Sequence, residues 1–134
     1  MTRFVVDAGA VLRLVADGLD VADGHELLAP TLLRSQTLSV LHEAVHRGDL
    51  AADVARERLR LVGRLRVRLL GDAVLRRTAW DVATELGWAS TYEAEYVALT
   101  RLQADALVTT DAGFARRVEG VVRVASLDEL SARA

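Results

Sequence analysis

Residues 3–7, with the sequence RFVVD, form a short apolar run that ends at an aspartate and is followed by small residues. A run this short and rich in β-branched side chains is typical of a strand buried inside a sheet. Residues 106–111, with the sequence ALVTTD, repeat the arrangement far along the chain. The carboxyl ends of parallel strands gather at one edge of a sheet, so parallel neighbours would place Asp7 and Asp111 close together.

The segments between these two strands predict several helices and further strands. Pro30 opens a segment with helical apolar spacing that ends near Gly48, and Asp49 is a favourable N-cap for a second helix that ends near Arg64. Residues 65–69 alternate apolar and arginine side chains, which predicts a strand. Helices are expected at residues 72–86, 91–103 and 112–119, a last strand at 121–124 and a capping box at 126–129. This order predicts one α/β domain over residues 1–134, a three-layer sandwich with a mostly parallel sheet between helices.

Composition excludes several classes of protein. Hydrophobic residues make up 51% of the 134 residues and proline occurs once, which is typical of an ordered globular chain. The chain has no cysteine, so disulfides and thiolate metal sites are excluded. No apolar stretch approaches the ~20 residues of a membrane span, and we expect a cytoplasmic protein. A net charge of −2 argues against a protein that coats nucleic acid by bulk attraction.

Three acids are candidates for a metal site. Asp7 and Asp111 follow strands, and Glu93 stands in the first turn of the helix expected after Ser90. Each has a structural alternative: either aspartate could cap the helix behind it, and Ser90 with Glu93 matches a capping box. Together, three carboxylates would repel one another without a cation, and carboxylate oxygens suit Mg²⁺ or Mn²⁺. The combination favours a site for one of these metals.

The order of four segments resembles a known family. Residues 5–8 (VVDA), 29–30 (AP, opening a helix), 92–99 (YEAEYVAL) and 107–111 (LVTTD) are similar in sequence and order to the PIN-domain ribonucleases, and most similar to VapC-type toxins of bacterial toxin–antitoxin pairs. The resemblance covers essentially the whole chain. It implies a PIN-like α/β sandwich, an antitoxin protein as partner, and a homodimer.

The same resemblance implies metal-dependent cleavage of RNA phosphodiester bonds. Asp7, Glu93 and Asp111 would hold Mg²⁺ or Mn²⁺, with Glu93 standing where the family usually has aspartate. Thr109 would orient a carboxylate by hydrogen bonding. Gln36 falls where the family has glutamate, and its neutral amide lowers both metal affinity and water activation. The alternative is therefore a PIN-fold binding module with weakened or absent catalysis.

Two further patterns lead to different predictions. Residues 42–46, HEAVH, match the HExxH helix of zinc metalloproteases, although no third histidine follows at the longer metzincin spacing. Glu43 lies two turns after Gln36, roughly 10 Å along a helix axis at ~1.5 Å per residue, so it cannot simply replace a ligand there. Arg64, Arg66 and Arg68 belong to a basic run that could contact RNA phosphates or could be only a solvated face.

Overall fold

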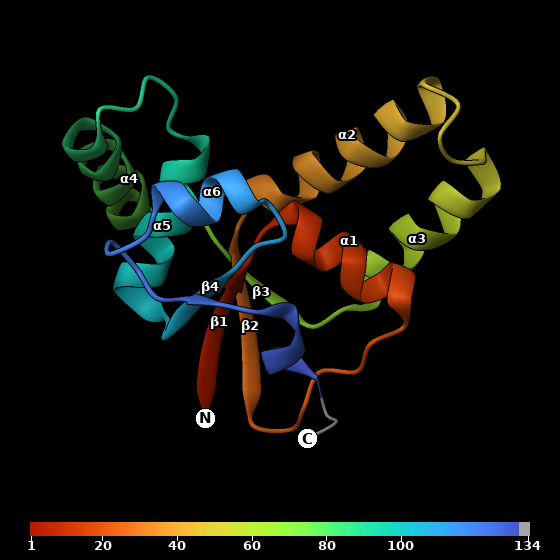
Figure 1. The fold of residues 1–134 in the computed structure, drawn as a ribbon, viewed down its shortest axis with the longest axis horizontal. Helices are drawn as coiled ribbons and strands as arrows, with labels where there is room; N and C mark the ends of the chain where they lie inside the picture. Colours follow the sequence, from red (N-terminus) through yellow and green to blue (C-terminus); the bar gives the residue numbers. More distant parts are fainter. Residues whose placement is uncertain (132–134) are drawn as a thin grey trace.

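The computed structural model describes residues 1–131 and contains, within that range, a sheet of five strands in the order β3-β2-β1-β4-β5 (Figure 1). The strands are β1 (Thr2–Val6), β2 (His25–Pro30), β3 (Val67–Leu70), β4 (Ala106–Val108) and β5 (Val124–Ala125). All four neighbouring pairs of these strands are parallel. The carboxyl ends of the described strands therefore lie along one edge of the sheet.

Six α-helices connect the described strands, and one 3-10 helix follows β5. They are α1 (Ala8–Asp17), α2 (Leu32–His46), α3 (Ala52–Arg64), α4 (Ala73–Leu86), α5 (Tyr92–Gln103), α6 (Ala112–Arg117) and η1 (Leu127–Leu130). None of the helices within residues 1–131 is long and apolar enough to cross a membrane.

The helices cover both faces of the sheet. The chain moves from β1 through β2 to β3 in one direction and then crosses back to β4 and β5. Right-handed connections put the helices of these two directions on opposite faces. Figure 1 shows α1, α2 and α3 together on one side of the strands and α4 and α5 on the other. The predicted three-layer α/β class is confirmed.

The core is centred on β1, β4 and α5. Residues 4–6 and 106–108 are buried, as are Ala94 and residues 96–99 of α5. Helix α5 packs against β1, β2 and β4, so it covers one face of the central strands. Small residues in this helix let it lie close to the sheet, which fixes the position of its first turn.

Strand β2 corrects the expectation for Pro30. Residues 25–30 form the strand between β1 and β3, and Pro30 is its last residue, in register with Leu70. A proline lacks an amide hydrogen and is tolerated at a strand end, where few ladder bonds remain. Thr31 follows, and helix α2 begins at Leu32. Proline therefore ends a strand here and does not open the helix.

Two other expected boundaries also move. The N-cap of α3 is Ala51, and the Asp49 carboxylate instead accepts a hydrogen bond from Arg47 Nε at 2.9 Å. The predicted last strand at residues 121–124 is short and shifted, because residues 118–122 continue as turns after α6. The capping box at Ser126 and Glu129 is confirmed and begins η1.

Candidate functional site

Asp7 and Asp111 lie at the same edge of the sheet. Val6 and Val108 are register partners in the parallel pair β1–β4, and Asp7 N–H donates to the Val108 carbonyl at 3.3 Å. Each aspartate also caps the helix behind it: Asp7 Oδ1 accepts from Ala10 N at 2.9 Å, and Asp111 Oδ1 accepts from Phe114 N at 3.1 Å. Each aspartate therefore caps a helix and also lies at the carboxyl edge of the sheet. Each carboxylate can still accept hydrogen bonds from, or coordinate, another partner.

A cavity of about 360 Å³ opens at this edge. It is bounded by the ends of β1 and β4, one face of α2 and the first turns of α1, α5 and α6. Its lining residues are Asp7, Ala8, Gly9, Gln36, Ser39, Val40, Glu43, Glu93, Tyr96, Thr110, Asp111 and Phe114. We call it the acid cavity. It contains every residue expected to hold metal and also Gln36.

The charge of Asp7 is disfavoured by its surroundings. Burial raises the pKa of Asp7, and the negative charges of Asp111 and Glu93 raise it further. Hydrogen bonds from Thr109 and from the Ala10 amide act in the opposite direction but do not cancel the rise. Among residues 1–131, neither Asp7 nor Asp111 forms a salt bridge. The two aspartates are therefore crowded carboxylates without a cationic partner.

Thr109 takes the orienting position expected of it. Its hydroxyl donates to Asp7 Oδ2, and its oxygen accepts from the Asp111 amide at 3.1 Å. One side chain thus links the two strand ends and fixes the rotation of the Asp7 carboxylate.

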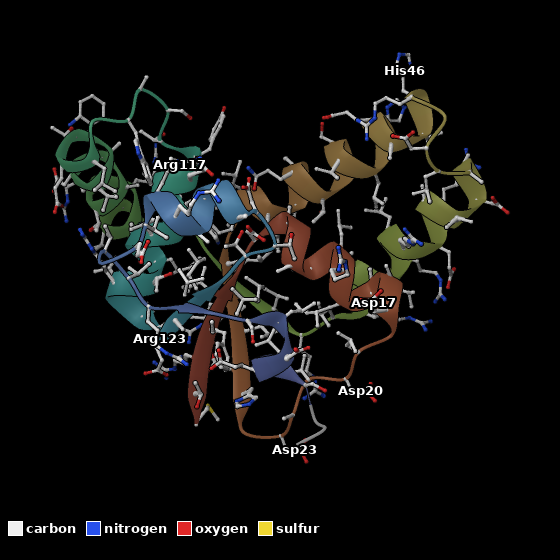
Figure 2. The ribbon with its side chains drawn as sticks, in the orientation of Figure 1. Asp17, Asp20, Asp23, His46, Arg117 and Arg123 are labelled. Atoms are coloured by element: carbon white, nitrogen blue, oxygen red, sulfur yellow. The ribbon has the colours of Figure 1, made fainter. Side chains whose placement is uncertain are left out.

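Glu93 lines the same cavity but is held by an arginine. Its Oε1 accepts from Arg117 at 2.5 Å, and Figure 2 shows Arg117 extending from α6. The capping box suggested for Ser90 and Glu93 is wrong, because Thr91 is the N-cap and Ser90 Oγ accepts from Tyr92 N at 3.3 Å. Within the described chain, no three His, Asp or Glu side chains are arranged to hold one metal ion. Asp7, Glu93 and Asp111 share a cavity without forming a closed set of ligands.

Gln36 is engaged by a side chain that the sequence did not single out. The Tyr96 hydroxyl donates to Gln36 Oε1 at 2.5 Å. Burial, together with the negative charges of Asp7 and Glu95, raises the pKa of Tyr96, so this hydroxyl stays a donor. One lone pair of the Gln36 carbonyl oxygen is therefore used by Tyr96, and the amide nitrogen of Gln36 is left as a hydrogen-bond donor.

Glu43 lies nearer to the site than its chain distance suggested. It lines the acid cavity together with Gln36, Ser39 and Val40 of α2. These four positions follow the i, i+3, i+4, i+7 spacing of one helix face, and that spacing was the signal that could have revealed Glu43. It adds an exposed carboxylate to the rim of the cavity.

The remaining candidates lie away from the acids. Arg66 and Arg68 line a separate hollow with residues 19–27 near the amino ends of the strands, and Arg68 pairs with Glu26 at 3.5 Å. Arg64 ends α3. His42 and His46 are exposed on α2, and Figure 2 shows His46 pointing outward at the far end of that helix. The structure therefore brings neither the arginines nor the histidines to the acid cavity.

The chemistry of the donors in the cavity fits a hard divalent cation. The acid cavity offers carboxylate oxygens from Asp7, Asp111 and Glu93, which are ligands that Mg²⁺ and Mn²⁺ prefer. The pKa of Asp7 is raised chiefly by burial and further by the charges of Asp111 and Glu93, and a bound cation would offset both effects. Asp7 and Asp111 are free to bind it as they stand, whereas Glu93 would first leave Arg117.

Comparison with protein-family models and with curated protein sequences finds no match. Comparison with solved structures does. PAE2754 from Pyrobaculum aerophilum superposes with a TM-score of 0.73 at 22% identity, covering 96% of this chain and 92% of that one. VapBC2 from Rickettsia felis, solved bound to a DNA fragment from its promoter, superposes with a TM-score of 0.63 at 11% sequence identity, covering 92% of this chain and 98% of that one. VapBC-1 from nontypeable Haemophilus influenzae superposes with a TM-score of 0.57 at 12% sequence identity, covering 94% of this chain and 98% of that one. Because these likenesses extend over nearly all of each chain, they establish the architecture: this chain has a VapC-type PIN-domain fold.

Proposed function

We propose that the chain is a divalent-metal-dependent endoribonuclease, the toxin half of a toxin–antitoxin pair, that hydrolyses RNA phosphodiester bonds. The observation that carries the proposal is the pairing of Asp7 and Asp111 at the ends of adjacent strands in one cavity, without a cationic partner in the described chain. Two such carboxylates on a rigid sheet are suited to hold a metal beside a phosphate.

The polar residues in and beside the cavity have distinct roles in this proposal. Asp7 and Asp111 would hold Mg²⁺ or Mn²⁺, which when bound supplies an activated water and neutralises charge on the phosphate. Thr109 orients the Asp7 carboxylate through its hydroxyl. Gln36, with its carbonyl oxygen held by Tyr96, presents its amide N–H groups to a phosphate oxygen.

Arg117 and Glu93 supply a second source of charge. The guanidinium of Arg117 pairs with Glu93 beside the two aspartates and lies 5.8 Å from the centre of the Phe114 ring. When Glu93 turns to the metal, Arg117 is released next to the cavity and can bind the RNA backbone. Arginine suits this task because its guanidinium makes bidentate contacts with phosphate.

The proposal of a protein partner follows from the similar solved structures. Two of the similar structures are VapBC complexes, and we propose that this chain likewise binds an antitoxin protein and forms a homodimer. Leu38 and Val40 of α2 and Val54 of α3 are large apolar side chains exposed on the same pair of helices. Such side chains are suited to burial against a partner.

A binding module that no longer cleaves RNA is the second candidate. Two observations favour it: Gln36 is neutral where the resembling family has an acid, and Glu93 is occupied by Arg117. In that case the partner surface would remain while the cavity held metal weakly or not at all.

RNA cleavage with Mg²⁺ or Mn²⁺ tests the proposal. We expect wild-type protein to cut single-stranded RNA, and Asp7→Asn to reduce the rate by about a hundredfold or more, because several kcal/mol of charge stabilisation are lost. Asp17→Asn is the matched control, since Asp17 is exposed at the opposite end of α1 (Figure 2). Absence of cleavage at any metal level with a broad set of RNAs would support the binding module instead.

A further inference from the structure

A second hollow lies between α4 and the first turn of α5. Its volume is about 590 Å³, within the ~300–1,000 Å³ usual for ligand sites. Small side chains, Ala73 and Ala79, leave the space open. Its larger lining residues are Arg76, Arg77 and Trp80 of α4, and Thr91 and Glu95 at the start of α5. We call it the Trp80 hollow.

Trp80 is an unusual side chain to leave in water. It is 68% exposed, whereas Trp88 packs against the core with its ring centre 6.4 Å from that of Phe114. Helix α4 buries its face at Leu75, Ala79, Val82 and Ala83, so Trp80 contributes little to that packing. A large exposed aromatic surface of this kind is typical of recognition sites.

The polar side chains of the hollow are suited to a nucleotide. Arg76 and Arg77 are exposed, and the salt bridges between described residues involve neither of them. Glu95 is partly buried and lies near the charge of Arg76. The hollow thus offers a flat aromatic ring, two phosphate-binding groups and one carboxylate that accepts hydrogen bonds.

The two cavities share one turn of helix. Thr91 and Glu95 face the Trp80 hollow, whereas Glu93 and Tyr96 face the acid cavity. At ~100° per residue these two pairs lie on nearly opposite sides of the helix, which is ~10 Å wide, so a short stretch of RNA that passes over the amino end of α5 would link the hollow to the acid cavity. Tyr92, which is 59% exposed, stands in the same turn.

We infer that the Trp80 hollow binds one base of single-stranded RNA whose backbone continues into the acid cavity. This inference rests on the proposed function and names how its substrate is held. Trp80 stacks on the base, and Arg76 and Arg77 contact the flanking phosphates. A base in a duplex is already stacked and paired, so double-stranded RNA does not enter the hollow.

Glu95 gives the hollow a preference among bases. A carboxylate accepts a hydrogen bond from an exocyclic amino group such as N4 of cytosine. Uracil has a carbonyl oxygen at the same position, which the carboxylate repels. Glu95 therefore favours cytosine over uracil, two bases of almost the same shape.

Tryptophan fluorescence provides a direct readout, because the chain has two tryptophans, and Trp80 is 68% exposed whereas Trp88 is partly buried against the core. In a Trp88→Phe variant, with EDTA present to prevent cleavage, oligocytidine should quench the remaining fluorescence. Trp80→Ala should weaken binding, followed with labelled RNA, by about tenfold, as expected for loss of one stacking contact of ~1–3 kcal/mol. Trp80→Phe should restore most of the affinity.

The polar contacts have their own matched variants. Oligocytidine should bind about fivefold or more tightly than oligouridine, and Glu95→Gln should abolish the difference because an amide also donates to the uracil oxygen. Arg77→Ala should reduce the salt dependence of binding, whereas Arg56→Ala, which removes an exposed arginine of α3, should not.

Three outcomes would overturn the inference. RNA affinity that is the same in wild type and Trp80→Ala would exclude stacking at this position. Absence of any RNA binding by the wild-type protein would also exclude the proposed base site. Trp80 emission that shifts to the blue with rising protein concentration and no RNA would show a second copy covering the hollow. Binding that depends on Trp80 without cleavage under any metal would instead refute the proposed ribonuclease and leave the RNA site standing.

Discussion

Asp7 carries its negative charge where burial and neighbouring acids oppose it. Its pKa in the folded protein is raised above the ordinary value of 3.8, chiefly by burial. Between these two pKa values the folded protein binds more protons than the unfolded chain, so stability falls as pH rises through this window. Above this pH window Asp7 is charged in both states, and the loss of folding stability that its charge causes is complete and persists at neutral pH.

We therefore predict that Asp7→Asn stabilises the metal-free protein at pH 7 while it reduces the cleavage rate by about a hundredfold or more. Asparagine can keep both local bonds, accepting from the Ala10 amide and donating to the Thr109 hydroxyl. Thermal melts in EDTA should show a melting temperature a few degrees higher than wild type, and the gap should close as pH falls through the window. A variant that melts below wild type at pH 7 would contradict this account of the charge.

Gln36 supports a second prediction, about metal affinity. In Gln36→Glu a carboxylate replaces the amide beside Tyr96, whose hydroxyl can still donate to it. We expect Mn²⁺ to bind about tenfold more tightly, or about 1.4 kcal/mol, because a negative ligand is added to the cavity. Isothermal titration measures this. Gln103→Glu, at the exposed end of α5, adds the same charge elsewhere and should leave the affinity unchanged.

At the scale of single residues, the sequence predicted the strand-end acids better than their partners. Asp7 and Asp111 were found because each follows a short apolar strand, which is a local pattern. The pairing of Glu93 with Arg117 and that of Gln36 with Tyr96 depend on how distant helices pack. No local pattern carries that information.

The first turn of α1 supports a prediction about how closely two elements approach. A Cβ at Gly9 would lie 2.5 Å from Thr110 Oγ1, next to Asp7. Thr110 is exposed and its Cβ lies 3.8 Å away, so we expect Gly9→Ala to turn the Thr110 hydroxyl aside and to forfeit most of the ~0.5–1 kcal/mol that alanine usually adds to a helix. Activity should fall, because both side chains lie in the acid cavity.

Gly63 provides the matched control within a helix. A Cβ there meets nothing within 4 Å, so Gly63→Ala in α3 should stabilise the protein by about 0.5–1 kcal/mol. Chemical denaturation of both variants measures the difference. Equal effects of the two substitutions would show that the approach of α1 to Thr110 is not tight.

Among the elements, β2 was missed by the sequence patterns, and α1 was foreseen only as a helix that Asp7 could cap. The sequence of β2, HELLAP, has only three consecutive apolar residues and ends in proline, which is a more frequent signal for the start of a helix. Its place between β1 and β3 comes from pairing with both neighbours. Strands with clear apolar runs or alternation, β1, β3 and β4, were predicted within about two residues.

For the molecule as a whole, the order of strands and helices was enough to predict a parallel three-layer sandwich. Right-handed connections leave few other arrangements for such an order. The position of the arginine run follows from the same order, because the run leads into β3 and therefore lies at the amino edge of a parallel sheet. That edge lies opposite the acids, so Arg64, Arg66 and Arg68 as RNA contacts remain a prediction for a surface distant from the acid cavity.

A crystal soaked with Mn²⁺ and measured for anomalous scattering tests the central claim most directly. The account predicts a manganese peak within ligand distance of carboxylate oxygens from both Asp7 and Asp111, with Glu93 turned away from Arg117 toward the ion. Diffraction from crystals of Asp7→Asn soaked in the same way should lack the peak. A cavity without manganese in the wild type, or a metal peak at His42 and His46 instead, would contradict it.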